Sequence, residues 1–458
     1  MTTLRVAEAA PAAEPPTLRR SVGPVQLTLY ALGSMLGAGI YGLIGQAAGQ
    51  MGNAVWLAFL VALVAALLTA LSYASLGSRY PHAGGAAYVV QRAFGWPILS
   101  FTVGLAVVCS GLTSVATQSR VFAANLAQLL GTPDLPVSLL ALGFLLLLTG
   151  LVLRGIRESI WVNVACTLVE AAGLLTVIAV GISYWGAVDY FETPPAPEGS
   201  SGDLFILLVL QGAVLTFFAF IGFEDAINVA EECRNPQRTV PIGLIGAMIV
   251  SALIYVAVAI TAVSVVPWSE LAAAPGPLTE VVKRAAPALP PILFTGITLF
   301  AVANTALVNY VTASRLVYGM ARQELLPARL AAVNRSRQTP HLAIAVLFAI
   351  LAPLCLTGSI AQLASATVLL LLTVFAVVNG AMVVLKRRPG EPAGHFEVPV
   401  VVPALGALVC AFLVVIRTST GDWRAPALAG AMLAGILLVF AFVRPKRPSW
   451  RQGAGTSA

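Results

Sequence analysis

The sequence predicts an all-α membrane protein with twelve transmembrane helices. Of its 458 residues, 59% are hydrophobic and only 10% are charged, whereas a soluble domain carries about a quarter charged residues. The apolar residues form runs of roughly 20 or more, which is the length of helix that crosses a bilayer. Lys and Arg cluster between those runs. A soluble domain could not cover its surface with so few charges, and a disordered chain would not have so much to bury. We therefore expect a polytopic protein surrounded by the lipid bilayer.

Twelve apolar segments account for most of the chain. They cover residues 24–50, 54–78, 97–122, 135–154, 159–184, 204–232, 240–266, 291–320, 341–357, 360–385, 398–418 and 425–443. The loop over 187–203 carries four acids and no Lys or Arg, whereas the loops at Arg154, Arg157 and 386–388 are basic. Because basic loops stay on the cytoplasmic side, we expect both termini in the cytoplasm and the protein in the cytoplasmic membrane.

Composition and motifs exclude several other functions. The net charge of +7 comes from these loop clusters, so it predicts membrane topology and not a nucleic-acid partner. The five cysteines are scattered with no CxxC, which predicts neither a disulfide framework nor a metal site. The three histidines fall in or beside loops, and no HExxH or GxSxG motif occurs. We therefore expect no cofactor, no metal and no enzymatic activity.

Two segments contain residues that disfavour a continuous helix. The first is rich in glycine, densest at Gly37-Ala38-Gly39, and each glycine costs about 1 kcal/mol relative to alanine. The sixth places Glu224 and Asp225 deep in an apolar run, where a charge must face protein or water. A close helix-packing face is the alternative for the glycines. Interruptions at corresponding positions of two five-helix halves favour a transporter site on broken helices.

Five motifs, in order, resemble those of the amino acid–polyamine–organocation superfamily of permeases. They are Gly33-Ser-Met-Leu-Gly-Ala-Gly-Ile40; Arg79-Tyr-Pro-His-Ala-Gly-Gly-Ala-Ala-Tyr88 with Ala93-Phe-Gly95; Phe217-Phe-Ala-Phe-Ile-Gly-Phe-Glu224, continuing into Ala230-Glu-Glu-Cys-Arg-Asn-Pro-Gln-Arg-Thr-Val-Pro-Ile242; Arg315-Leu-Val-Tyr-Gly-Met-Ala-Arg322; and Phe396-Glu-Val-Pro399 with Pro403. The resemblance covers residues 22–445, a permease domain between cytosolic tails 1–21 and 446–458. It implies a LeuT-type fold, a five-plus-five inverted repeat with helices 1 and 6 broken, plus two C-terminal helices.

The resemblance also implies where an amino acid would bind. In such permeases the break in the first helix exposes backbone N–H groups, which after Gly37 are those of Ala38 and Gly39. A helix N-terminus attracts an anion such as the substrate carboxylate. The carbonyls that would hold the substrate ammonium group match Met35, Phe218 and Ile221. Because these contacts use main chain, they do not identify the amino acid.

Several side chains near these breaks are further candidates. Phe218 matches an aromatic gate over the substrate, with an ordinary packing aromatic as the alternative. Glu224 matches an acidic gate residue that could also carry a proton; a structural carboxylate is the alternative. We expect Asp225 to cap the half-helix that follows it. Five polar or small residues map near the pocket or bond between helices: Ser110, Gly111, Ser114, Asn304 and Asn309. Two cytosolic acids, Glu231 and Glu232, are expected to pair with Arg234 and Arg238.

Glu170 is a third carboxylate within an apolar segment. Transporters of the cationic amino acid type often carry a lysine here, so a lysine-based coupling mechanism does not transfer. A protonatable glutamate at this position could provide the coupling instead. The eighth segment has Ala303-Asn304-Thr305 where a Ser/Thr pair would ligate sodium, which disfavours sodium coupling. We predict Glu170 and Glu224 as proton-coupling residues.

The sequence therefore favours a secondary carrier for an amino acid or related small amine that works by alternating access. Proton-coupled symport is the leading interpretation, and an amino acid or amine exchanger is the alternative. An ion carrier on the same fold is a further alternative, which would not need a carboxylate-binding break.

Overall fold

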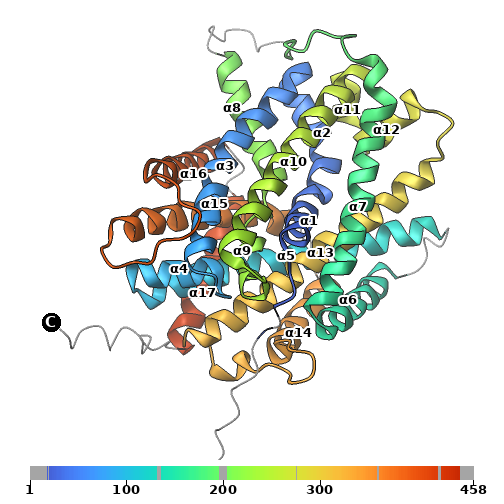
Figure 1. Ribbon diagram of the computed structural model, residues 1–458. Helices are drawn as coiled ribbons and strands as arrows, with labels where there is room; N and C mark the ends of the chain where they lie inside the picture. The colour runs from blue at the N-terminus through green and yellow to red at the C-terminus, as the bar shows by residue number, and fades with distance from the viewer. Residues whose placement is uncertain are drawn as a thin grey trace, which may run out of the picture.

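The computed structural model describes residues 18, 20–130, 136–194, 204–274, 276–357, 361–420 and 424–443 (Figure 1). Its α-helices are α1 (Pro24–Leu36), α2 (Ala38–Met51), α3 (Val55–Arg79), α4 (Gly85–Phe94), α5 (Pro97–Leu129), α6 (Val137–Arg154), α7 (Ile156–Gly181), α8 (Leu204–Phe217), α9 (Asp225–Asn228), α10 (Pro236–Val265), α11 (Trp268–Ala273), α12 (Pro277–Ala285), α13 (Pro291–Arg322), α14 (His341–Thr357), α15 (Ala361–Arg387), α16 (Val401–Thr420) and α17 (Arg424–Val443). Within these ranges the backbone forms no strand, only one isolated bridge between Val22 and Cys233. The predicted all-α class is confirmed.

Each predicted apolar segment contains a helix of the structure, and three helices lie outside those segments. The three are α4, α11 and α12. Over the described ranges, seven helical stretches are long and apolar enough to cross a membrane, and shorter apolar helices accompany them. The protein is therefore a membrane protein. The tails predicted at 1–21 and 446–458 lie almost wholly outside the described residues.

Proline and glycine set several helix ends. Pro24, Pro236 and Pro277 stand in the first turn of α1, α10 and α12, where a missing N–H costs no intrahelical bond. Gly95 ends α4 with φ of 68°, a left-handed conformation that glycine adopts without strain. Because α4 stops there, the chain turns directly into α5.

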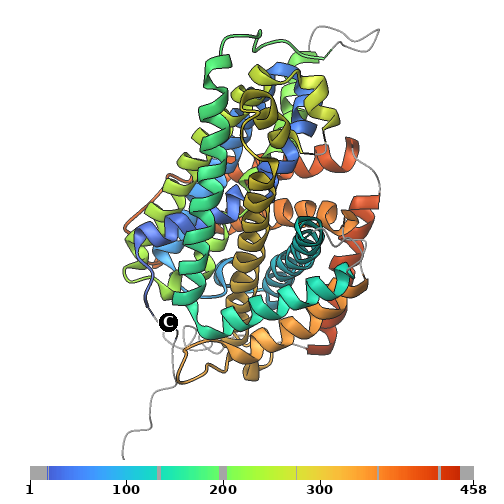
Figure 2. The same ribbon diagram turned by 90° about the vertical axis from the view of Figure 1, so that its right-hand side faces the viewer.

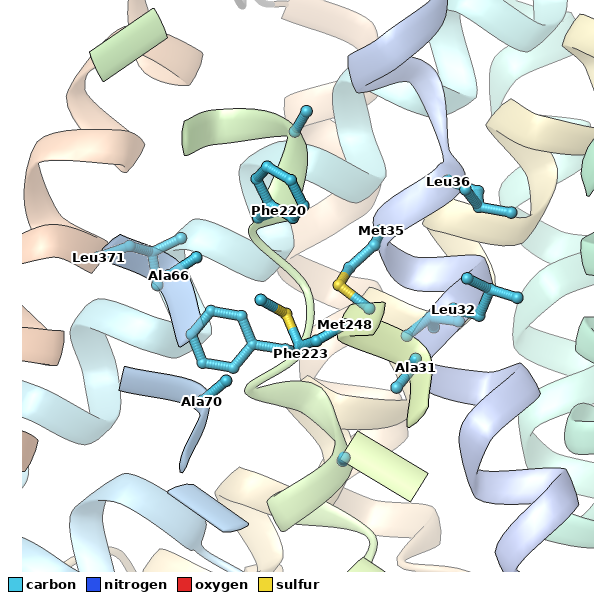
Figure 3. Packing of buried hydrophobic residues seen from close by; sticks show 14 of the residues in the cluster. Ala31, Leu32, Met35, Leu36, Ala66, Ala70, Phe220, Phe223, Met248 and Leu371 are labelled. Carbon is cyan, nitrogen blue, oxygen red and sulfur yellow. The ribbon is translucent and has the colours of Figure 1, made fainter. Parts of the chain in front are cut away.

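Two helices are interrupted within the bundle, at both predicted places. Between α1 and α2 the break is the single residue Gly37. Between α8 and α9 it is longer, a 3-10 turn over Phe218–Phe220 followed by a turn in which Gly222 has φ of +124°. In Figure 3, Met35 and Leu36 from the first break and Phe220 and Phe223 from the second lie around Met248 of α10. The breaks therefore lie side by side in the core.

Long helices support the broken ones on both sides. The helix α10 packs on α3 and α1, and α13 packs on α5 and α7. In Figure 2, α7 and α13 run along the length of the bundle, whereas in Figure 1 α13 crosses the view obliquely; both helices contact α1. These straight helices give the two breaks a rigid surround.

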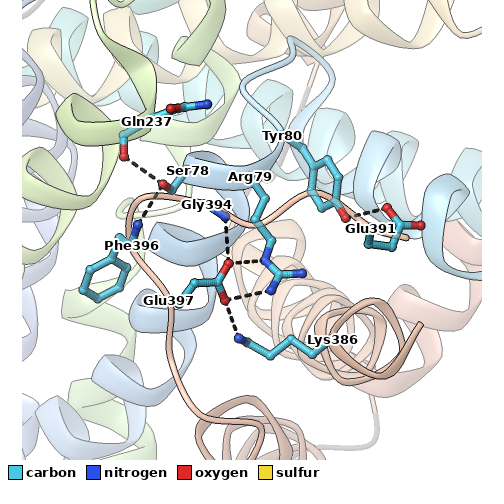
Figure 4. A network of polar contacts seen from close by, with 9 residues as sticks. All are labelled: Ser78, Arg79, Tyr80, Gln237, Lys386, Glu391, Gly394, Phe396 and Glu397. Carbon is cyan, nitrogen blue, oxygen red and sulfur yellow. Dashed lines mark hydrogen bonds and ion pairs between the residues drawn. The ribbon is translucent and has the colours of Figure 1, made fainter. Parts of the chain in front are cut away.

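A polar clamp ties the loop between α15 and α16 to the end of α3. Glu397 accepts hydrogen bonds from Arg79 and Lys386 (Figure 4). Glu391 accepts hydrogen bonds from Tyr80, at 2.8 Å, and from Arg92, at 2.9 Å. The clamp also holds α4 against this loop, because Arg92 of α4 donates to Glu391.

Candidate functional site

A hydrogen bond joins the two breaks directly. Ser34 Oγ donates to Asp225 Oδ2 at 2.6 Å, and both side chains are buried. Gly222 packs against the backbone and hydroxyl of Ser34 so closely that a Cβ there would lie 2.6 Å from Ser34 Oγ. The left-handed φ and this contact both require glycine at position 222. The last turn of α1 and the start of α9 therefore form one unit.

A tyrosine of α10 makes the second link between the breaks. Tyr255 Oη lies 2.5 Å from the carbonyl oxygen of Met35 and 3.0 Å from that of Ala219. The ring is fully buried against Phe59 and Phe220. Carbonyls at a helix end lack an intrahelical partner, and the single hydroxyl hydrogen of Tyr255 can be donated to the acceptor on either side.

The first break also touches α13. A Cβ at Gly37 would overlap Thr305 Oγ1, and that hydroxyl donates to the Ala301 carbonyl at 3.1 Å. Gly37 is therefore present because α13 approaches the chain at this point. The α2 half-helix begins at the next residue, Ala38. No side chain caps its N-terminus, so no capping group accepts a hydrogen bond from its first N–H groups.

The backbone positions predicted for substrate lie together around these links. Met35 O is engaged by Tyr255, and Ile221 lies in the turn before α9, partly buried. Ala38 and Gly39 form the first turn of α2. The side chains of Ala38 and Phe218 lie outside the described residues, so the predicted gate at Phe218 stays a prediction.

The other predicted polar residues divide into two groups. On α5, a Cβ built on Gly111 would lie 3.5 Å from the Asn309 carbonyl oxygen. The preceding residue, Ser110, is buried. Asn309 donates to the Thr305 carbonyl of its own helix at 2.8 Å. These residues line the contact of α5 with α13. Ser114, one turn after Ser110, is partly buried.

Asn304 belongs to a separate network between α1, α7 and α13. It accepts from Asn163 at 2.7 Å and donates to Thr167 Oγ1 at 3.0 Å. A Cβ at Gly33 would lie 2.5 Å from the Asn304 amide. The small Gly33 thus lets α1 approach this network, which makes Asn304 an interhelical bonding residue in this conformation.

Glu170 is fully buried one turn further along α7. Neither carboxyl oxygen has a hydrogen-bond partner in the part of the chain that the structure describes. Asn304, Tyr41 and Tyr255 are its polar neighbours, and Tyr41 Oη donates to the Glu170 backbone carbonyl at 3.1 Å. A charge on this carboxyl group would therefore act on the tyrosine that links the two breaks.

One of the two acids at the second break, Asp225, differs from expectation, and the gate role of Glu224 stays a prediction. Glu224 Oε2 accepts from the Gly222 N–H at 2.8 Å, which holds the turn. Asp225 is the first residue of α9, and the N-cap position is Glu224, so the predicted capping role of Asp225 is wrong. Its carboxylate is drawn to Ser34 instead, because α1 crosses at that residue and the hydroxyl provides a charge-assisted bond.

The partners expected for the two cytosolic acids are also wrong. Glu232 pairs with Arg315 of α13 at 3.2 Å, with both side chains fully buried. Glu231 pairs with Arg322 at 3.1 Å and lies 3.7 Å from His82. Arg234 and Arg238 are exposed. Neighbours in sequence were the wrong choice because the chain turns at Ala230–Glu232 and directs both acids towards α13.

Sequence reasoning missed Tyr255 and Ser34, the residues that join the breaks. A tyrosine in the apolar run of α10 and a serine inside a glycine-rich motif were the only signals. Interhelical contacts are needed to distinguish them from other polar residues of membrane helices. No group of three or more His, Cys, Asp or Glu that could hold a metal ion occurs among the residues with described positions.

Comparison with known proteins identifies the family of this chain. Residues 22–448 match the family model described as amino acid permease. The chain belongs to the amino acid permease family. The resemblance inferred from the five motifs is therefore confirmed, and the family is one of transporters.

Three relatives of this permease are named for different substrates. The methylthioribose transporter of Bacillus subtilis (strain 168) is 30% identical over 421 residues, which cover 86% of this chain and 87% of the relative. The branched-chain amino acid permease BcaP of the same organism is 28% identical, covering 87% and 88%. The chloroplastic cationic amino acid transporter 9 of Arabidopsis thaliana is 31% identical, covering 68% of this chain and 57% of the relative.

Proposed function

We propose that this permease is a secondary active transporter that moves an amino acid or related small amine across the cytoplasmic membrane by alternating access. The observation that carries the proposal is the pair of adjacent breaks joined by Tyr255 and by the Ser34–Asp225 bond. Broken helices expose backbone groups that a bilayer tolerates only around a cavity or ligand. Both termini then lie in the cytoplasm, because the basic loops face that side.

The breaks offer complementary charges to a zwitterionic substrate. The N-terminus of α2, at Ala38 and Gly39, would bind the carboxylate. The carbonyls of Met35, Phe218 and Ile221 would bind the ammonium group. Tyr255 now occupies the Met35 carbonyl, so substrate binding would displace that hydroxyl or share the acceptor with it. Phe218 and Glu224 would close the site.

The order of helices supports a LeuT-type arrangement of twelve spans. The α1–α2 pair would correspond to the α8–α9 pair, the first helix of each five-helix half. Such inverted repeats place the substrate where the two broken helices meet, near the bilayer midplane. Alternating access would then rock these broken helices against the long helices α5 and α13.

We propose proton coupling through Glu170. A buried carboxylate without a counter-charge costs several kcal/mol, so the neutral acid fits the packing observed here. Losing the proton would create a strong acceptor near Tyr255 and pull its hydroxyl from the break carbonyls. Proton release would thereby loosen the link between the breaks. An exchanger, the alternative, would use Glu170 only as a structural group.

Proteoliposomes with an imposed pH gradient test this function. A thermal-shift panel of amino acids, polyamines and methylthioribose first identifies a stabilising substrate, since a ligand of the native state raises stability. An inward proton gradient should then drive its uptake in the wild type. Glu170→Gln should abolish that response while exchange against internal substrate survives. Glu224→Gln is the control, because a gate residue should alter binding first.

Three outcomes would count against the proposal. Uptake that ignores the gradient but needs internal substrate would make the protein an exchanger. Substrate-independent ion flux would make it an ion carrier. Failure of every tested amine and amino acid to bind would remove the proposed substrate class.

A further inference from the structure

Four arginines gather where two helical hairpins meet at the proposed cytosolic end. Arg154 and Arg157 flank the turn between α6 and α7, and Arg335 and Arg337 lie in the loop between α13 and α14. All four are exposed. Their hairpins touch: Thr339 Oγ1 donates to the Leu153 carbonyl at 3.4 Å. We call these four residues the arginine patch.

The backbone of both turns holds the arginine patch in place. Asn334 Oδ1 accepts from the N–H groups of Ser336 and Arg337, at 3.0 and 3.1 Å, and its own N–H donates to the Thr339 carbonyl at 2.9 Å. A Cβ at Gly155, whose φ is +146°, would lie 3.8 Å from the Arg337 carbonyl. The backbones of the two turns that carry the arginine pairs therefore lie close together.

The patch lacks internal charge compensation. No carboxylate forms an ion pair with any of its four arginines within the ranges that the structure describes. Glu158 is an acid beside the patch, since its Oε2 would lie 2.8 Å from a Cβ at Gly155, but it forms no ion pair with the four arginines among the described residues. Two helices also begin here, α7 and α14, and helix N-termini add positive potential. The patch is suited to an anionic group.

A stripe of exposed apolar side chains, which we call the α7 stripe, runs along α7 and onto the 3-10 turn Ile182–Tyr184 and leads to the patch. Trp161, Leu168, Leu175 and Ile182 recur every seven residues and are 57%, 55%, 54% and 54% exposed. From Trp161 to Ile182 the stripe is roughly 30 Å long at 1.5 Å per residue, which is the thickness of the hydrocarbon core. Trp161 lies one turn from Arg157, as an interfacial tryptophan does. Arg157 therefore stands at headgroup level.

We propose that the arginine patch binds the headgroup of an anionic phospholipid whose acyl chain lies along the α7 stripe. The phosphate oxygens accept hydrogen bonds from guanidinium groups of both hairpins. Each guanidinium group offers paired N–H donors that fit two phosphate oxygens. Trp161 contacts the glycerol region. Bound lipid would thus add a link at the proposed cytosolic end between α6–α7 and α13–α14, which the bonds of Asn304 with Asn163 and Thr167 already join deeper in the bundle. Basic pockets between transmembrane helices bind such lipids by the same physics.

Thermal unfolding of the full-length protein in detergent tests this proposal. Phosphatidylglycerol should raise the melting temperature by several degrees, and phosphatidylcholine at the same concentration should not. Arg335→Gln/Arg337→Gln and Arg154→Gln/Arg157→Gln should each remove the difference between the two lipids. The matched control is Arg234→Gln/Arg238→Gln, two exposed arginines at the same end of the molecule, which should keep it. Both patch variants change only exposed side chains, so their lipid-free melting temperature should equal that of the wild type.

Three results would overturn the proposal. Equal stabilisation by the two lipids would show that binding does not depend on the headgroup charge. Loss of the phosphatidylglycerol effect in the control variant as well would show attraction to basic loops in general. An equal effect from glycerol 1-phosphate would make the patch a site for a soluble phosphate. The readout involves no transport, so it is independent of the proposed function.

Discussion

Ser34 donates its hydroxyl hydrogen to Asp225 across the two helix breaks, at 2.6 Å and 191 positions apart in sequence. A charge-assisted bond of this length is among the strong hydrogen bonds of a protein interior. It ties the end of α1 to the start of α9, and Tyr255 ties the same two breaks from α10. The relative position of the breaks in this conformation therefore rests on a few named contacts.

Replacing Ser34 with alanine should loosen the joined breaks. The Asp225 carboxylate would lose its shortest bond while staying buried, which costs about 1–3 kcal/mol. We expect a lower melting temperature and weaker substrate binding. Ser72→Ala is the matched control, since Ser72 is also buried but donates within its own helix α3, to the Leu68 carbonyl. Equal losses in both variants would show that the link between breaks is unimportant.

Tyr255→Phe should reduce transport while the protein stays folded. The ring keeps its contacts with Phe59 and Phe220, but the hydroxyl near the Met35 and Ala219 carbonyls is removed. Uptake should fall more than the melting temperature. Tyr310→Phe provides the comparison, because Tyr310 is a buried tyrosine that donates to the Ile344 carbonyl at 3.2 Å. If the two variants behave alike in uptake, Tyr255 has no special role.

Gly37→Ala should impair folding or transport by collision with α13. Its new Cβ would overlap Thr305 Oγ1, while Thr305 Cβ is 3.3 Å away. Overpacking of this kind costs typically about 1–3 kcal/mol. Thr305→Ala removes the clashing atom, so the double variant should recover much of the loss, a coupling that a double-mutant cycle measures. If the losses of the two single variants simply added in the double variant, the contact between positions 37 and 305 would not be the cause of the loss.

The buried Arg315–Glu232 pair should show strong coupling. Either single change, Arg315→Met or Glu232→Gln, leaves one buried group without its partner and should cost about 3–5 kcal/mol when a charge remains. The double variant should be more stable than the Arg315→Met single. Arg322→Gln, in an exposed pair with Glu231, should cost at most about 1 kcal/mol. The melting temperatures of the four variants test this coupling. A double variant that loses as much stability as the two single variants together would contradict it.

The apolar segments and both breaks followed from the sequence because composition and glycine act locally. Twenty apolar residues make a helix in lipid whatever their neighbours, and Gly37 weakens its own turn. Conversely, α4 and α11 are too short and too polar to appear in a search for spans. Their positions depend on packing against other elements.

The partners of buried polar groups could not be predicted in the same way. Asp225 was assigned to its own helix, and Glu232 to arginines two and six residues away, because sequence shows only near neighbours. The structure pairs them with Ser34 and Arg315, which belong to distant helices. Such choices depend on which helices meet, and a single sequence does not contain that information.

The clamp at Glu397 should make the stability of the protein fall in acid. Burial alone would raise the pKa of Glu397, but hydrogen bonds from Arg79 and Lys386 outweigh it and lower the pKa from 4.5 to about 2. A carboxylate with a depressed pKa stabilises the native state above its ordinary pKa, and this contribution is lost as pH falls from 4.5 towards 2. The melting temperature of the wild type should therefore drop over that interval by more than that of Glu397→Gln. Glu270→Gln, in the exposed pair with Arg284, should keep the wild-type slope. A Glu397→Gln variant with the full wild-type slope would show that other acids cause the acid sensitivity.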